Sequence, residues 1–146
     1  MVKLSQTGVK MSQRWLPTPN SKYYIPKETF LTAVHFCKQY PLWLAELSTA
    51  PNSNKGVSYE RDVVQTSNLS DTTAEMAVKR AEMARKKDLV DRIAEEVGGE
   101  TYGRWIVQGV CFDFPFYVLE QRGIPCGKDL YYQMRRKFYY ELSMRI

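Results

Sequence analysis

The sequence has few of the residues that build metal sites and covalent catalytic centres. Its 146 residues include one histidine, His35, and three cysteines, Cys37, Cys111 and Cys126. The cysteines lie far apart and lack the paired close spacing of a zinc site. His35 has no second ligand or nucleophile near it in the sequence. We therefore expect no metal and no cofactor.

Two further absences argue against an enzyme. The sequence has no glycine-rich phosphate loop. The acidic residues Asp88, Asp91, Glu95 and Glu96 recur at i, i+3 and i+4 beside basic residues, which is typical of ordinary helix surface charge. A general acid or base would need a buried group with a perturbed pKa, and no pattern marks one. We expect a protein that is not an enzyme.

Long apolar runs are also missing. No stretch approaches the roughly 20 residues needed to span a bilayer, and the first residues, MVKLSQTGVKMSQRW, lack the apolar segment of a secretory signal. We expect a cytoplasmic protein with no membrane partner. The length fits one domain with one core.

Acidic residues are absent before Glu28, so charge is unevenly distributed. Residues 1–27 carry five basic residues and no acid, residues 28–100 carry nine basic and twelve acidic residues, and residues 101–146 carry seven basic and four acidic residues. Basic ends flanking an acidic middle favour a polyanionic partner, since phosphate contacts supply most non-specific nucleic-acid affinity. We predict a basic, flexible tail over residues 1–25.

Hydrophobic periodicity predicts an all-α domain over residues 26–146. The segment after Pro26 is predicted to form a helix interrupted at Tyr40 and Pro41. Residues 50–70 are polar and predict a connecting loop. A long helix of about 26 residues is predicted next, capped by Ser70, Asp71 or Thr72 and ended by Gly98 or Gly99.

The last third predicts three shorter helices. TYGRWIVQGVC is predicted to turn Trp105, Ile106 and Val110 inward, and DFPFYVLEQRG to begin at an Asp113 cap and end before Gly123. The final helix, about residues 128–146, has an apolar stripe that we predict is core. The stripe contains Tyr131, Met134, Phe138 and Leu142.

The rest of the final helix is basic and rich in hydrogen-bonding side chains. Two short helices joined by a turn, with a basic second helix, is the helix-turn-helix arrangement that places its second helix in the major groove, and we predict one over about residues 113–146. Arginine can bind guanine, glutamine can bind adenine, and tyrosine and lysine can hold phosphates. The predicted DNA-binding residues are Lys128, Tyr132, Gln133, Arg135, Arg136, Lys137 and Tyr139.

The order of these motifs resembles phage-encoded transcriptional regulators of the RinA and ArpU type. Asp71 and Thr73 match the Asp-x-Thr start of that family's central helix, and residues 135–138, RRKF, match a signature near its end. The resemblance covers roughly residues 26–146. It implies a C-terminal helix-turn-helix, double-stranded DNA as partner, a place in the host cytoplasm, and regulation of phage late genes.

Two alternatives remain open at this stage. An aromatic surface containing Tyr132, Tyr139 and Tyr140 is also typical of protein interfaces, which would fit a phage effector that grips a host protein such as RNA polymerase or a defence nuclease. The small-residue face of the long helix, at Ala74, Ala77, Ala81 and Ala84, must also be covered. Either the helices of residues 26–49 cover it or a second copy does, which would make a homodimer.

Overall fold

The computed structural model describes residues 19–49 and 66–146, with side chains described from Thr72 in the second range. These residues are mostly helical and contain no strand, which confirms the predicted all-α class. None of the helices in this part of the chain combines the length and the apolar character needed to cross a membrane.

The first described helices form the predicted broken pair. Helix α2 spans Lys27–Lys38 and follows Pro26, whose extended backbone (φ −61°, ψ 153°) places it just before the helix. Helix α3 spans Tyr40–Ser48 and has Pro41 in its first turn. A proline there has no amide hydrogen to continue the bonding of α2, so the chain changes direction at Gln39.

Helix α5 spans Thr66–Cys111 and changes direction at Gly99, where φ is 69° and ψ is −170°. The left-handed break at a glycine was predicted, because a residue without a Cβ atom adopts positive φ at little cost. The predicted start was wrong. The helix begins at Thr66, so the positions expected to cap it lie inside a helical turn, and residues 66–70 are helix where a loop was expected. The remainder of that loop, residues 50–65, lies outside the described residues.

Two short segments lead to the C-terminus. Helix α6 spans Phe116–Gln121 and helix α7 spans Lys128–Ser143. Asp113 was predicted to cap α6, and this prediction is wrong. Pro115 occupies that position, and Asp113 instead has a positive φ of 62°. Gly123, directly after α6, has the expected positive φ, at 99°.

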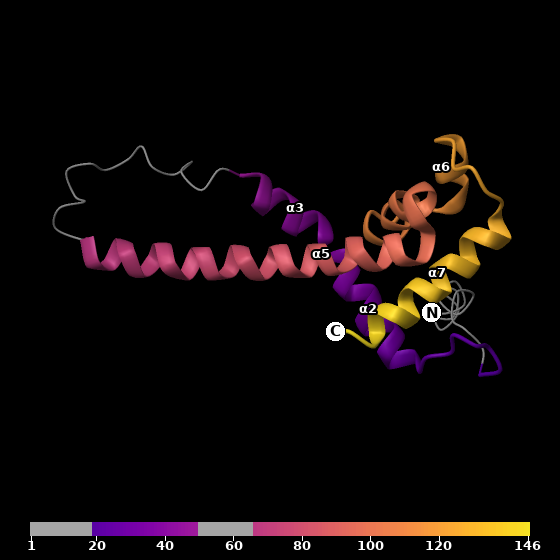
Figure 1. The fold of residues 1–146 in the computed structure, drawn as a ribbon, viewed down its shortest axis with the longest axis horizontal. Coiled ribbons are helices and arrows are strands. Elements are labelled where there is room, and N and C mark those ends of the chain that lie inside the picture. The colour runs from indigo at the N-terminus through magenta and orange to yellow at the C-terminus, as the bar shows by residue number, and fades with distance from the viewer. Residues whose placement is uncertain (1–18, 50–65) are drawn as a thin grey trace, which may run out of the picture.

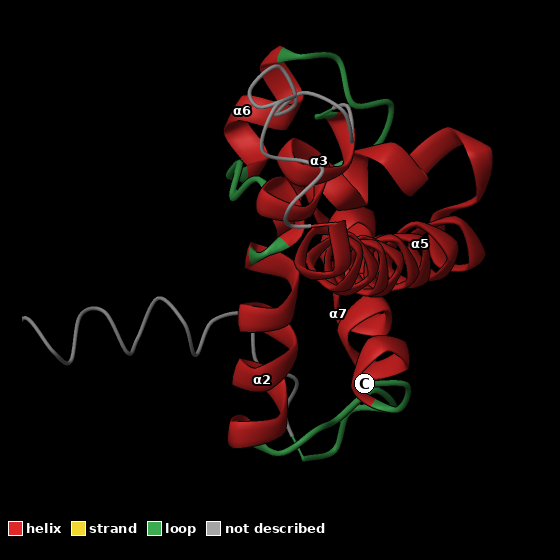
Figure 2. Cartoon of the chain, turned by 90° about the vertical axis from the view of Figure 1, so that its left-hand side faces the viewer, coloured by secondary structure: helices red, strands yellow, loops and turns green. Residues whose placement is uncertain are grey.

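The core lies where α2, the second half of α5 and α7 meet. Figure 1 shows α5 as a long rod, with α2 and α7 crossing it near one end and α6 beyond them. Figure 2 looks along the rod and shows α2 and α7 on the same side of it. The stripe predicted on α7 is buried: Tyr131, Met134, Phe138 and Leu142 are at most 8% exposed. Burying each such side chain contributes roughly 1.5–3 kcal/mol.

The other half of α5 projects beyond the core. From Thr72 to Lys79 its side chains are exposed, including Met76 and Val78 at 44% and 66%. Helix α3 reaches α5 near Arg80, whose guanidinium donates hydrogen bonds of 2.7 and 3.2 Å to the carbonyl oxygens of Glu46 and Leu47. The helices of residues 26–49 therefore leave three of the four alanines of the small-residue face exposed. The expectation that these helices cover the face is wrong at those three positions. These are Ala74, Ala77 and Ala81.

Candidate nucleic-acid interface

The predicted DNA-binding residues lie on helix α7, and the structure divides them between two flanks of that helix. Because the core stripe faces α2 and α5, residues on one side of the stripe turn toward neighbouring helices and residues on the other side turn toward solvent. The packed flank contains Tyr132, Arg135 and Tyr139. The outer flank contains Gln133, Arg136 and Lys137, and Lys128 is exposed at the first position of the helix, one turn before Tyr132.

The packed flank is part of the protein interior. Tyr139 is 2% exposed, and its ring lies edge-on to Phe30 with centroids 5.0 Å apart. Burial raises the pKa of Tyr139. The Arg135 guanidinium lies over the Tyr139 ring at 5.3 Å. Tyr139 is therefore a core residue, and its prediction as a DNA contact is wrong.

Tyr132 is intermediate between the two groups. It is half-buried, and its ring packs edge-on against Tyr131 with centroids 5.0 Å apart and lies 6.3 Å from Phe116 on α6. These contacts tie α7 to α6. An aromatic residue held on both sides in this way is better placed to fix the angle between the two helices than to reach a ligand.

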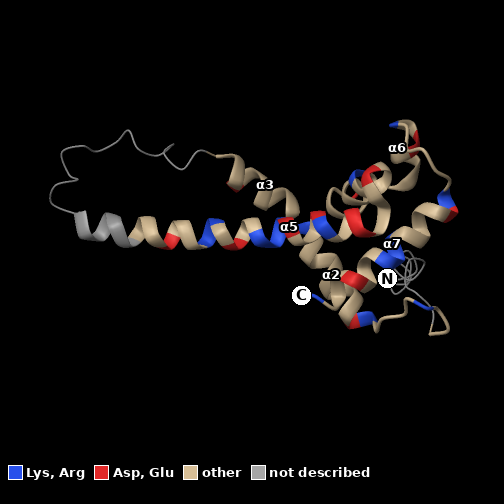
Figure 3. Ribbon diagram, in the orientation of Figure 1, with Lys and Arg blue, Asp and Glu red and all other residues tan. Residues whose placement is uncertain are grey.

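Three cations of α7 lie outside the packed core: Arg136 and Lys137 on the outer flank, and Lys128 at the start of the helix. Lys128 and Gln133 are exposed, and Arg136 and Lys137 are half-buried. Within the described residues, none of these three cations forms an ion pair with a carboxylate. Figure 3 shows basic positions on α7 and also along the projecting half of α5. The outer flank therefore carries positive charge that an external anion could neutralise.

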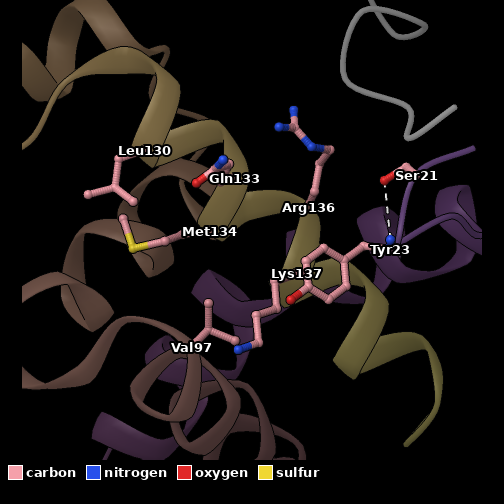
Figure 4. Close-up of a pocket in the computed structure, with 8 residues that line it drawn as sticks. All are labelled: Ser21, Tyr23, Val97, Leu130, Gln133, Met134, Arg136 and Lys137. Atoms are coloured by element: carbon pink, nitrogen blue, oxygen red, sulfur yellow. Dashed lines mark hydrogen bonds between the residues drawn. The ribbon is translucent and has the colours of Figure 1, made fainter.

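A hollow of about 440 Å³ opens beside this flank, between α7, the end of the first part of α5 and the segment that precedes α2. Its lining is mixed apolar, polar and charged, and Figure 4 shows the side chains that line it. The lining residues are Ser21, Tyr23, Val97, Leu130, Gln133, Met134, Arg136 and Lys137.

The segment before α2 is fixed to α7 by aromatic contacts. The rings of Tyr23 and Tyr140 pack edge-on with centroids 5.5 Å apart, and Ile25 is buried at 6% exposure. The Tyr23 amide donates a hydrogen bond of 3.2 Å to Ser21 Oγ, and the Lys22 ammonium lies 5.4 Å from the Tyr23 ring. The end of the predicted tail, residues 19–25, thus packs against α7. Residues 1–18 lie outside the described part of the chain.

One arginine, Arg145, holds two acidic residues, Glu96 and Glu141. Arg145 binds Glu96 on α5 through two hydrogen bonds, of 2.8 and 3.3 Å, and reaches Glu141 on α7 at 3.3 Å. The hydrogen bond from Arg145 lowers the pKa of Glu96. Glu141 lies one helical turn after Lys137, the spacing at which the two would otherwise pair. Arg145 thereby competes with Lys137 for the carboxylate of Glu141.

The segment between α6 and α7 is longer than the turn of three or four residues common in a helix-turn-helix. It runs over residues 122–127 and is held from both sides. The Ile124 amide donates a hydrogen bond of 3.0 Å to the Leu119 carbonyl, Ile124 is buried, and the Tyr102 hydroxyl donates one of 3.3 Å to the Pro125 carbonyl. The angle between α6 and α7 is therefore fixed by packing as well as by the turn.

The thiols do not contribute to this surface. Cys37 and Cys111 are buried, and the contact with Cys37 together with burial raises the pKa of the Cys111 thiol. A thiol that stays protonated is a poor nucleophile and metal ligand. In the part of the chain that the structure describes, no three or more His, Cys, Asp or Glu side chains are grouped so that they could hold a metal ion.

No family model, curated protein or solved structure matches this chain. The resemblance to phage regulators therefore stays a prediction. Sequence reasoning missed Ser21, Tyr23 and Val97 as parts of the hollow and Arg145 as the residue that binds two carboxylates. Only the basic charge of the segment around Lys22 pointed toward them.

Proposed function

We propose that this protein is a transcriptional regulator that binds double-stranded DNA with the outer flank of α7. The observation that carries the proposal is that no described carboxylate forms an ion pair with three cations of α7, which are Arg136 and Lys137 beside Gln133 on the outer flank and Lys128 at the start of the helix. Cations bind the phosphates, and arginine and glutamine can also bind base edges.

Two further features support the same function. Helix α7 follows α6 after a turn, the order of elements that a helix-turn-helix uses to bring its second helix into the major groove. Lys22 is next to Tyr23, whose ring packs on Tyr140 of α7, so this cation lies beside the same helix. The resemblance to phage regulators is to the same functional class.

The experiment that tests the proposal is selection of duplexes from a random pool by the full chain. We expect a recovered consensus, and we expect Arg136→Ala to weaken binding to it by about 1–3 kcal/mol if Arg136 contacts a base. The matched control is Lys79→Ala, which removes an exposed cation from the projecting half of α5. Failure to recover any consensus, or equal binding by the two variants, would contradict the proposal.

The protein-binding effector is the less well supported alternative. It was based on an aromatic surface formed by three tyrosines of α7, and one of them, Tyr139, is buried while Tyr132 and Tyr140 are half-buried. The aromatic surface of α7 is therefore smaller than the sequence indicated. The cations of the outer flank favour a polyanion over an apolar protein surface.

A further inference from the structure

We infer that the hollow beside α7 is a binding site for a ligand that carries two neighbouring phosphate groups. The ligand would be either the backbone of bound DNA or a free diphosphate compound. The DNA source rests on the proposed function, and the free compound does not. The site adds Ser21, Tyr23 and Arg145 to a function that the sequence located on α7 alone.

The hollow offers two separate cationic positions. Arg136 and Lys137 are neighbours on α7, and Figure 4 shows the Arg136 guanidinium and the Lys137 ammonium pointing in different directions, with Lys137 directed toward Val97. One phosphate group contacts one such position well. A ligand with two phosphate groups can contact both, and the second contact then adds affinity without a second loss of translational freedom.

Neutral donors complete the rim. The Ser21 hydroxyl oxygen already accepts a hydrogen bond from the Tyr23 amide, so the hydroxyl hydrogen remains available to donate to a phosphate oxygen. The Gln133 amide lines the same hollow and supplies further N–H donors. Phosphate oxygens accept several hydrogen bonds each, and a hydrogen bond to an ionised group is stronger than one between neutral groups.

The apolar lining residues strengthen these contacts. Val97, Leu130 and Met134 line the hollow, and apolar side chains beside a charge lower the local dielectric constant below that of water. The attraction between a half-buried cation and an anion is greater there than on a fully hydrated surface. A sugar carried between two phosphates would also have an apolar surface to pack against.

Arg145 acts as a positioning residue for this site. By holding Glu96 and Glu141, it competes with Lys137 for the carboxylate one turn away. Without Arg145, Glu141 would be free to pair with Lys137 at i, i+4, and an anion would have to displace it. The charge of the hollow therefore depends on a contact made by the last residues of the chain.

The test is a titration of the full chain with pyrophosphate, in which the NMR signals of the Gln133 side-chain amide report binding. Chloride at the same ionic strength is the control for screening, and inorganic phosphate tests the second position. We expect pyrophosphate to bind more tightly than phosphate and chloride to cause no saturable shift. The Arg136→Gln, Lys137→Gln double variant should lose at least about tenfold in affinity, since hydrogen bonds to charged groups contribute about 1.5–3 kcal/mol.

Two controls separate the site from general effects of charge and folding. The double variant Lys79→Gln, Arg85→Gln removes two exposed cations from α5 and should keep the parent affinity. Arg145→Gln should weaken pyrophosphate binding by about twofold, and adding Glu141→Gln should restore it. Equal affinity in the α5 and α7 double variants, or a saturable shift with chloride, would overturn the site.

The source of the phosphates is decided by competition. If a random-sequence duplex displaces pyrophosphate, the DNA backbone occupies the hollow. If both bind together, the hollow takes a free diphosphate compound. Either result supports the site. A protein that binds pyrophosphate but no duplex keeps the site and contradicts the proposed function, so the two ideas fail separately.

Discussion

The rings of Phe30 on α2 and Tyr139 on α7 pack edge-on with centroids 5.0 Å apart. This contact joins the two helices that flank the core, and it removes Tyr139 from the surface on which the sequence placed it. It also means that substitutions on α7 have two different consequences, which depend on the flank. Substitution of a packed-flank residue is expected to affect folding, and under the proposed function substitution of an outer-flank residue affects DNA binding.

Replacing Tyr139 by alanine is expected to lower the free energy of unfolding by about 3–5 kcal/mol, because a large buried ring is removed and a cavity is left. Tyr117→Ala is the matched control. Tyr117 is 64% exposed on α6, and its loss should change the free energy by less than about 0.5 kcal/mol. Urea unfolding followed by circular dichroism measures both. A Tyr139→Ala protein as stable as the parent would show that the ring is not core.

Gly109→Ala is expected to destabilise the fold. A Cβ atom at Gly109 would clash with the Tyr131 hydroxyl oxygen, and Tyr131 is buried and cannot move aside without disturbing α6. Alanine in a helix gains up to about 1 kcal/mol over glycine, and overpacking costs typically about 1–3 kcal/mol, so a net loss is expected.

The control for this prediction is Gly127→Ala. No atom lies within 4 Å of a Cβ placed at Gly127, and its φ of −83° suits alanine. Adding Tyr131→Phe to Gly109→Ala should recover part of the lost free energy, because it removes the oxygen atom that the new methyl group meets. A Gly109→Ala protein more stable than the parent in urea would contradict the close approach.

Tyr40→Phe is expected to lower the free energy of unfolding by about 1.5–3 kcal/mol, the range for a hydrogen bond to a charged group. The Tyr40 hydroxyl donates to Asp91 Oδ1 at 2.7 Å, and Lys87 binds the other carboxylate oxygen at 2.8 Å. Burial and this hydrogen bond raise the pKa of Tyr40. A double-mutant cycle with Asp91→Ala isolates the pair. If the two substitutions add without coupling, the hydrogen bond contributes nothing.

The ion pair between Glu96 and Arg145 predicts a dependence of stability on pH. Arg145 lowers the pKa of Glu96 below its ordinary value of 4.5, so the stabilisation is present above that value and is lost as the pH falls through the lower, folded pKa. Urea unfolding at about pH 6 and about pH 3 should differ less in Glu96→Gln than in the parent. Glu95→Gln, at an exposed neighbouring position, should behave as the parent does. Identical pH dependence in all three proteins would contradict the assignment.

Ala81→Glu is expected to leave the free energy of unfolding within about 0.5 kcal/mol of the parent, because Ala81 is exposed on the projecting half of α5. Sedimentation of the same variant tests whether a second copy covers that half. A parent that sediments as a dimer and a variant that sediments as a folded monomer would establish self-association there. Loss of folding in the variant would show that this face is covered within one chain.

Much of the fold could be read from the sequence. The break after α2, the glycine at the kink of α5 and the apolar stripe of α7 are local features. Pro41 lacks an amide hydrogen, Gly99 tolerates positive φ, and a spacing of three, four and four residues places Tyr131 to Leu142 on one helical face. Such features act within a few residues, so neighbouring letters suffice to predict them.

Helix starts were less predictable. Thr72 with Glu75 resembles a capping pair, but α5 begins six residues earlier, at Thr66. Asp113 resembles a cap for α6, but its backbone adopts a positive φ and Pro115 takes the position. A capping residue indicates only where a helix can start. Whether it starts there depends on how the preceding chain is placed.

The candidate site divides in the same way. The sequence alone determined that α7 carries both an apolar stripe and a cluster of cations. Only the tertiary structure decided that Tyr139 faces Phe30 while Lys137 lines a hollow with Tyr23 and Val97. A tyrosine side chain has an apolar ring and a polar hydroxyl, so the residue type alone does not determine whether it faces the core or the solvent. Phe30, which packs on Tyr139, and Tyr23 and Val97, which line the hollow with Lys137, lie about 40 to more than 100 residues away from them in the sequence. Only the folded chain brings them together.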